Sequence, residues 1–392
     1  MFDRSRPQSR NVKILLLALG YFFMFGYSNV SYLLPIYYSA VGFSPAQSGL
    51  LASSYFVASL IFRLVLGGLL ARWGFKRFFT AGSVITVASA IWVVFADSFS
   101  AAFVARFLLG AGTAFHQIAL ASYQSMAFAE KERGFAFSVI MAGGLAPMMT
   151  AVPIADRLLA NGSLTLYILI PVVQTALLAV VTLIFLDTDD VALVAPRSGG
   201  NPFKGVLSCF KVPELAFALS FVFLFSLVDA SSAFMSIMTA SYGLMASFFL
   251  SSNAVVGVFV RLFLGKALDK YPRQKLAAPI IIGMALMLLF ASICPTHTSL
   301  MVLGFIFGIG MGFGFPLCLA LVSDCAPMRL QPQAISLTWF FVALDFAVIP
   351  AALSYICGVT TPVAGFRIVV ILILLSVAGA EYMRRRMTSV KK

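Results

Sequence analysis

Residues 63–77 read RLVLGGLLARWGFKR, which closes a long apolar run and leads into a cluster of basic side chains. Residues 261–275 read RLFLGKALDKYPRQK and repeat this arrangement 198 positions later, with Arg, Leu, Leu and Gly at the same spacing. Gly110 and Gly112 align with Gly308 and Gly310 at the same offset. A repeat at half the chain length predicts two homologous halves related by internal symmetry.

The composition excludes a water-soluble globule. Of the 392 residues, 61% are hydrophobic and only 10% are charged, whereas soluble domains carry roughly 25% charged residues. The apolar residues fall in blocks that approach the ~20 residues needed to cross a bilayer as a helix. The sequence therefore predicts an all-α membrane protein with twelve transmembrane helices. Their expected ranges are 13–38, 46–70, 78–96, 99–127, 134–157, 164–186, 214–239, 245–267, 276–294, 298–323, 333–356 and 362–383.

Positive charge predicts the orientation of these helices. Basic residues gather in both terminal segments, in the polar stretch between the halves and in every second loop. Of the 27 lysines and arginines, only Arg157 and Arg367 lie on the opposite side, and Arg63, Arg106 and Arg261 lie within spans. Because cytoplasmic loops are enriched in Lys and Arg, both termini are expected in the cytoplasm. The net charge of +13 thus follows from topology, and nucleic acid is not an expected partner.

A polar linker is expected between the two halves. Residues 187–213 are rich in proline, glycine and charge compared with the spans on either side, a composition typical of a flexible connection. The predicted organisation is an N-terminal six-helix bundle over 1–186, a cytoplasmic linker over 187–213 and a C-terminal six-helix bundle over 214–392.

The basic motif resembles the signature loop of the major facilitator superfamily of secondary transporters. In that family a Gly, an acid, a basic residue, a second Gly and two further basic residues form a cytoplasmic latch. The matching positions are Gly67, Arg72, Gly74, Lys76 and Arg77, with Ala71 in place of the acid. The second copy keeps the acid and its neighbour as Asp269 and Lys270. The resemblance covers the whole chain and implies two pseudo-symmetric six-helix bundles, a monomer, and a small-molecule substrate carried across a lipid bilayer.

Two further segments resemble motifs of this family, and the pattern around Arg63 and Leu64, together with Asp345, looks most like bacterial efflux members. Arg106 opens a segment in span four like the family's helix-four motif, whose arginine is implicated in proton coupling. The run 143–147, GGLAP, is a degenerate form of the Gly–Pro motif of exporters. The resemblance implies a multi-pass protein of the bacterial cytoplasmic (inner) membrane that exports a small organic solute by proton antiport.

Ionisable side chains inside spans are costly, so each is a functional candidate. Asp229 and Asp345 are the two acids that we expect deep in spans, and Arg106 is a cation at similar depth. A carboxylate whose surroundings change with conformation also changes its affinity for a proton. We expect Asp229 or Asp345 to exchange a proton while Arg106 offers a competing charge. The alternative is a static ion pair that joins two helices.

In the superfamily, helices one, four, seven and ten line the central cavity, which selects a set of polar substrate-binding candidates. At 100° per residue, several polar side chains of span four share the face of Arg106. The cavity candidates are Tyr27, Asn29, Tyr32, Thr113, His116, Gln117, Gln124 and Ser226. This mixture of charge, amides and aromatics favours an amphiphilic or zwitterionic solute.

Other function classes receive less support. A proton-linked importer differs from an exporter only in the gradient it uses. A membrane sensor on a transporter scaffold would need an added soluble domain, and an intramembrane enzyme would need clustered acid–base or metal-binding groups. The five cysteines show no metal-ligand spacing, and no GxxxxGK[ST] motif for ATP is present. We therefore expect no enzyme activity, no metal and no cofactor.

Overall fold

The protein is described by a computed structural model that covers residues 9–128, 130–187, 208–264, 272–327 and 330–390. Contacts divide the chain into two compact units, Met1–Arg197 and Ser198–Lys392. Residues 188–207, which make up most of the predicted linker, lie outside the described part of the chain.

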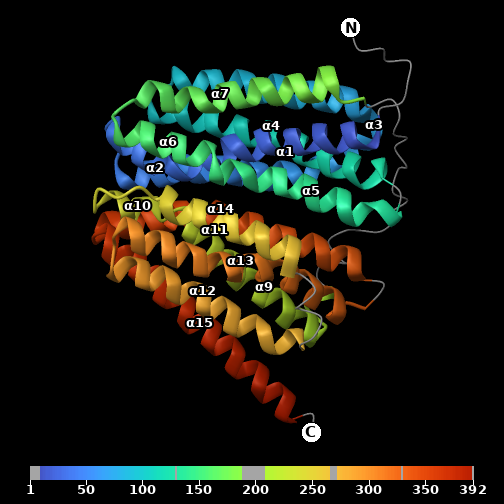
Figure 1. Ribbon diagram of the computed structural model, residues 1–392, viewed down its shortest axis with the longest axis vertical. Helices are drawn as coiled ribbons and strands as arrows, with labels where there is room; N and C mark the ends of the chain where they lie inside the picture. The colour runs from blue at the N-terminus through green and yellow to red at the C-terminus, as the bar shows by residue number, and fades with distance from the viewer. Residues whose placement is uncertain (1–8, 129, 188–207, 265–271, 328–329, 391–392) are drawn as a thin grey trace. The chain divides into compact units, whose positions relative to one another are not determined.

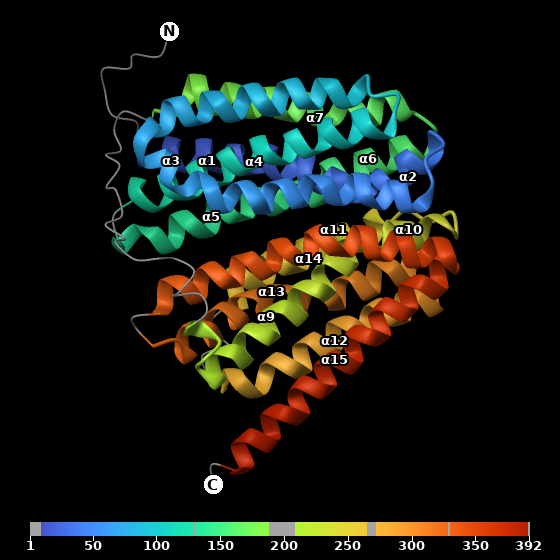
Figure 2. The ribbon, with the colours of Figure 1, turned by 180° about the vertical axis from the view of Figure 1, so that it is seen from behind.

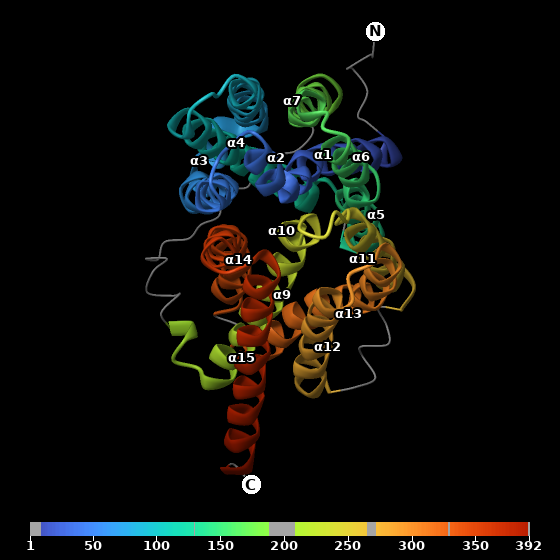
Figure 3. The same cartoon turned by 90° about the vertical axis from the view of Figure 1, so that its left-hand side faces the viewer.

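The N-terminal unit is a bundle of long helices that run side by side (Figure 1). Its elements are α1 (Arg10–Val30), the 3-10 turn η1 (Ser31–Leu33), α2 (Leu34–Ala40), α3 (Pro45–Val94), α4 (Phe99–Ala127), α5 (Glu130–Met149), α6 (Ala151–Ala160), α7 (Leu164–Val180) and the π-helical turn η2 (Val181–Phe185). Helix α4 packs along α3, while α1 packs against both α5 and α7. Figure 3 views this unit roughly along its helices.

The C-terminal unit repeats the plan with α9 in the position of α1 along the chain. Its elements are α9 (Pro213–Ala233), α10 (Ser236–Ala240), α11 (Ser247–Phe259), the π-helical turn η3 (Val260–Leu264), α12 (Arg273–Ile293), α13 (His297–Cys325), α14 (Gln331–Val359) and α15 (Pro362–Val390). Helix α13 packs on α11 and α12, and α14 packs on α9. Figure 2 shows α12 and α15 side by side at the edge of this unit.

The prediction of an all-helical membrane fold is confirmed. Among the described residues, ten helices are long and apolar enough to cross a membrane. Of the remaining two predicted spans, 46–70 falls on the first part of α3. The span 245–267 falls on α11 and η3 as far as residue 264, beyond which its residues are outside the described part of the chain. Helices α3, α4 and α13 begin at a side-chain cap: the side chains of Ser44, Ser98 and Thr296 each accept a hydrogen bond from the backbone N–H three residues on.

A close helix contact appears twice, once in each unit, at positions that the repeat relates. A Cβ on Gly110 of α4 would lie 2.0 Å from the carbonyl oxygen of Tyr55 on α3, and one on Gly308 of α13 would lie 2.7 Å from that of Asn253 on α11. Tyr55 and Asn253 are themselves 198 residues apart. Glycine is required at both positions because any side chain would collide with the backbone of the neighbouring helix.

The basic loop expected at 71–77 is shorter than the sequence indicated. Residues on both sides are helical, so that α3 contains two predicted spans, and the break is confined to Gly74 with φ 74° and ψ 166°. This backbone conformation is essentially restricted to glycine. A single residue therefore separates the two spans of α3.

Replacing Gly74 with alanine should destabilise the protein by about 1–3 kcal/mol, the usual cost of holding a side chain in such a conformation. The new Cβ would meet nothing within 4 Å, so the loss would come from backbone strain alone. Thermal unfolding of the detergent-purified protein measures it. Gly283→Ala is the control, because Gly283 is helical and also has open space. Equal melting temperatures for Gly74→Ala and the parent chain would contradict the prediction.

Candidate functional site

The N-terminal unit holds a buried arginine surrounded by hydroxyl groups and aromatic rings. Arg106 is 1% exposed. Its Nη1 donates a 3.1 Å hydrogen bond to Ser31 Oγ, and its guanidinium carbon lies 5.0 Å from the centre of the Tyr55 ring. Tyr38 and Tyr167 also interact with it electrostatically. Arg106 forms no ion pair with any residue that the structure describes.

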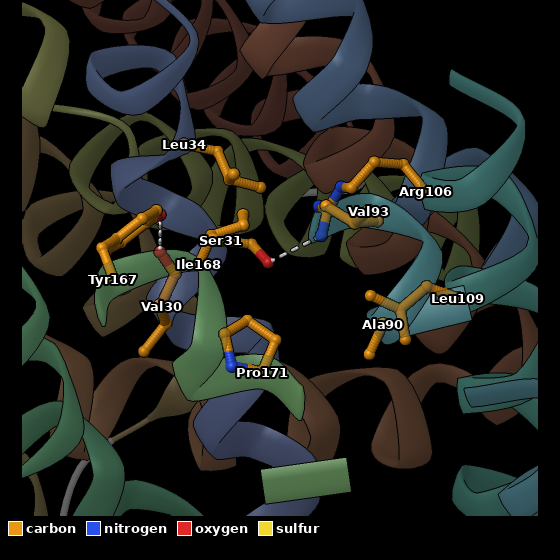
Figure 4. A pocket seen from close by; sticks show the side chains of 10 residues that line it. All are labelled: Val30, Ser31, Leu34, Ala90, Val93, Arg106, Leu109, Tyr167, Ile168 and Pro171. Atoms are coloured by element: carbon orange, nitrogen blue, oxygen red, sulfur yellow. Dashed lines mark hydrogen bonds between the residues drawn. The ribbon is translucent and has the colours of Figure 1, made fainter. Parts of the chain in front are cut away.

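This arginine borders a pocket that is otherwise mainly apolar (Figure 4). The pocket has a volume of about 280 Å³, counting the space at its mouth. Arg106 and Ser31 lie next to each other at its edge, and Tyr167 donates a 2.9 Å hydrogen bond to the carbonyl of Val30. The lining comes from α1, η1, α2, α3, α4 and α7: Val30, Ser31, Leu34, Ala90, Val93, Arg106, Leu109, Tyr167, Ile168 and Pro171.

A hydrogen-bonded chain connects two of the predicted cavity residues. Tyr27 Oη lies 3.0 Å from Thr113 Oγ1, which donates to the carbonyl of Leu109. The tyrosine is therefore the donor in the first bond. The Ser31 hydroxyl that receives the bond from Arg106 donates to the carbonyl of Tyr27. Tyr27 and Thr113 thus belong to the network that positions the partner of Arg106.

Gln117 faces a different set of groups. Its Oε1 accepts hydrogen bonds from Ser59 Oγ, at 3.1 Å, and from Arg63 Nη2. The guanidinium of Arg63, one of the three cations expected within spans, turns to this amide between α3 and α4. The amide oxygen is thereby occupied inside the unit.

His116 is buried and has partners for both ring nitrogens. Nδ1 lies 3.2 Å from the carbonyl of Gly112, and Nε2 lies 3.2 Å from Ser83 Oγ. Because a carbonyl only accepts, Nδ1 carries the hydrogen and Nε2 accepts from the serine. This arrangement joins α4 to the second part of α3 and favours a structural role over contact with a solute.

The C-terminal unit holds the two acids selected from the sequence. Asp345 on α14 is 1% exposed and accepts a hydrogen bond from Ser226 Oγ on α9. Asp229 lies one turn further along α9, is partly buried, and interacts electrostatically with both Asp345 and Arg261. Arg261 lies in η3, and its Nη2 donates to the carbonyl of Met311 at 3.3 Å. Two acids, Asp229 and Asp345, and one cation, Arg261, therefore interact electrostatically within the C-terminal bundle.

The other predicted site residues occupy more separate positions. Asn29, Tyr32 and Gln124 are buried within the N-terminal unit. Of the latch residues, Arg72, Lys76 and Arg77 are exposed around the break at Gly74, and Gly67 lies in the helix before it. Asp269 and Lys270 lie outside the described residues.

Sequence reasoning missed Asp156 and the aromatic surroundings of Arg106. Asp156 is 4% exposed and interacts electrostatically with Tyr167. The predicted span 134–157 puts Asp156 at its end, whereas the chain breaks at Thr150 and continues as α6 to Ala160, so Asp156 lies inside a helix. The signal available in the sequence was an acid among apolar residues.

Comparison with known proteins identifies related sequences and structures. The family model described as the Major Facilitator Superfamily matches residues 16–344. A search of curated proteins found no match. The fold is similar to that of a peptide transporter POT mutant in complex with sulfate, with TM-score 0.75 and 16% identity over 95% of this chain and 94% of that one. A mutant of the nucleoside transporter NupG is similar with TM-score 0.78 and 14% identity, over 96% and 100% of the two chains.

Proposed function

This chain belongs to the Major Facilitator Superfamily of membrane transporters, and on that premise we propose that it exports a small organic solute in exchange for protons. It is a multi-pass membrane transporter and not an enzyme. The observation that supports proton exchange is the group formed by Asp229, Asp345 and Arg261 in the C-terminal unit. Arg106 is the proposed competing charge in the N-terminal unit.

The electrostatics of this group support a proton-carrying role. Two carboxylates that face each other away from water repel strongly, and a single arginine offsets only one negative charge. Arg261 forms no ion pair with either acid among the described residues, and its Nε has no hydrogen-bond partner there. A group held by long-range attraction can be rearranged by small helix movements. A movement that brings Arg261 closer to Asp229, or takes it away, would change how firmly the acids hold a proton.

Transport in reconstituted vesicles with an imposed pH gradient tests this proposal. For an antiporter, an acidic vesicle interior should drive uptake of labelled solute, and an acidic exterior should not. The opposite dependence would indicate a proton-linked importer and overturn the proposal, as would equal uptake with and without a gradient. The first solutes are a dipeptide and a nucleoside, because the similar structures are of peptide and nucleoside transporters. A sugar and an amphiphilic zwitterion complete the panel.

The positive charges support the proposed orientation, with both termini on the cytoplasmic side of the bacterial inner membrane. In that orientation the exposed Arg72, Lys76 and Arg77 lie at the cytoplasmic surface, where a latch with Asp269 and Lys270 would act. Protease accessibility of a tag at either terminus, in spheroplasts against inside-out vesicles, checks the orientation. Cleavage in spheroplasts would overturn it.

A further inference from the structure

The surroundings of Arg106 contain more hydrogen-bond donors than acceptors. Arg106 Nε and Nη2 are buried and have no hydrogen-bond partner among the described residues, and the same holds for the Tyr38 hydroxyl. Tyr38 lies on α2, is 3% exposed and interacts electrostatically with Arg106. Unpaired buried donors are costly, at about 1–3 kcal/mol each and more when charged.

Among the residues that the structure describes, the charge of Arg106 also lacks a counterion. The Tyr55 ring contributes about 2 kcal/mol when such a contact is desolvated, which is well below the several kcal/mol that a buried charge costs. The buried acid of this unit, Asp156, interacts electrostatically with Tyr167, and it is not among the groups that act on Arg106. A single positive charge therefore faces the pocket with two of its N–H groups unused.

The pocket limits what can satisfy this charge. Its enclosed free space is about 10 Å³, which is about what a single water molecule needs and far below the roughly 300 to 1,000 Å³ of sites for drug-sized ligands. Apolar side chains such as Leu34, Val93 and Ile168 form most of its wall. One charge and an apolar wall favour a monovalent anion that gives up its water easily.

We infer that the edge of this pocket beside Arg106 is a binding site for a small monovalent anion, either a halide or the carboxylate group of a larger solute, held by Arg106 and Tyr38. Ser31 donates its hydrogen to the Tyr27 carbonyl, so it positions Arg106 and does not bind the anion. The anion accepts hydrogen bonds from Arg106 Nε and Nη2 and from the Tyr38 hydroxyl. Tyr55 covers one face of the guanidinium. The site lies within the N-terminal unit and does not depend on the direction of transport or on proton exchange.

Thermal unfolding of the full-length protein in detergent tests the site without any transport. Sodium gluconate is replaced by sodium bromide at constant sodium concentration, because gluconate is too large for the pocket. Bromide should raise the melting temperature in a saturable manner, by about 2–4 °C once its concentration is about five times its dissociation constant. The rise should vanish in Arg106→Met, which keeps the length of the side chain without its charge.

A milder pair of variants keeps the test valid if Arg106→Met fails to fold. Tyr38→Phe removes one unpaired donor and should weaken bromide binding about tenfold, as expected for a hydrogen bond to a charged group. Tyr37→Phe is the matched control. Its ring packs 5.4 Å from that of Tyr167, and it does not act on Arg106. It should bind bromide as the parent chain does.

Three outcomes would overturn the inference: no bromide-dependent rise in the parent chain, the same rise in Arg106→Met, or equal weakening in Tyr37→Phe and Tyr38→Phe. Anomalous scattering from bromide in crystals should give a peak at the Arg106 guanidinium, and a peak elsewhere alone would also overturn it. Sodium acetate distinguishes the source. A rise with acetate as well assigns the site to carboxylates, and a rise with bromide alone assigns it to free halide.

Discussion

Replacing Asp345 or Asp229 with asparagine should uncouple solute movement from the pH gradient. Asparagine preserves the shape of the side chain and much of its hydrogen bonding, but it cannot bind and release a proton. When two sites in a protein are coupled, a ligand bound at one typically changes the affinity of the other by about 5- to 150-fold. We expect a loss in that range for gradient-driven uptake, while exchange of labelled for unlabelled solute without a gradient continues.

The two acids should not respond equally. Asp345 is almost fully buried and receives the Ser226 hydrogen bond, whereas Asp229 is partly buried and interacts with Arg261. Asp229 is the first candidate for the carrier, because it lies on the seventh predicted span, which is expected to line the cavity. If Asp229 is the carrier, Asp229→Asn removes the gradient dependence and Asp345→Asn reduces it less.

Asp324→Asn provides the matched control in the same unit. Asp324 is about half exposed and forms a 2.8 Å ion pair with Arg273, so its removal changes an acid without touching the buried group. It should retain gradient-driven uptake. Full coupled transport in both Asp229→Asn and Asp345→Asn would remove these residues as carriers, and an equal loss in Asp324→Asn would show that the effect is not specific.

Replacing Gly110 with alanine should destabilise the N-terminal unit severely. The added Cβ would lie 2.0 Å from the carbonyl oxygen of Tyr55 and 2.9 Å from its Cα, and backbone cannot move aside as a flexible side chain does. Overpacking usually costs about 1–3 kcal/mol, and contact with backbone should reach or exceed the upper end. Gly308→Ala, at 2.7 Å from the Asn253 carbonyl oxygen, should have a smaller effect of the same kind. Melting temperature and the monodisperse fraction in detergent measure both.

Gly257→Ala is the control for this prediction, because the nearest atom to its Cβ would be the Gly308 carbonyl oxygen at 3.7 Å, an ordinary contact. Gly20→Ala tests an intermediate case, with a flexible leucine side chain at 3.3 Å. The expected order of stability is Gly257→Ala, Gly20→Ala, Gly308→Ala and then Gly110→Ala. A Gly110→Ala protein as stable as Gly257→Ala would contradict the close packing of α3 and α4.

The apolar blocks of the sequence predicted the helices well because bilayer thickness sets their length and the absence of water requires internal hydrogen bonds. The interruptions were harder to predict. The breaks at Gly74 and Thr150 and the 3-10 turn at Ser31 depend on how neighbouring helices pack, which periodicity does not report.

The sequence predicted the charged residues of the candidate sites but not the residues that surround them, for a related reason. Asp229, Asp345 and Arg106 stand out because charge is rare in spans. The tyrosines around Arg106 come from α2, α3 and α7, and a sequence cannot show that these rings meet. The same applies to His116, whose partner Ser83 is 33 residues away in the chain.

The 198-residue offset of the repeat relates the surroundings of Arg106 in the N-terminal unit to those of Asp229 in the C-terminal unit. It maps Ser31 onto Asp229 and Arg106 onto Gly304. The corner that holds serine and arginine in one half therefore holds aspartate and glycine in the other, and a Cβ on Gly304 would meet the carbonyl oxygen of Phe249 at 2.5 Å. This corner therefore carries a positive charge in one half and a negative charge in the other. A chain made of two copies of the N-terminal half would contain the arginine corner twice and the aspartate corner not at all, so it would lack the acids proposed to carry the proton.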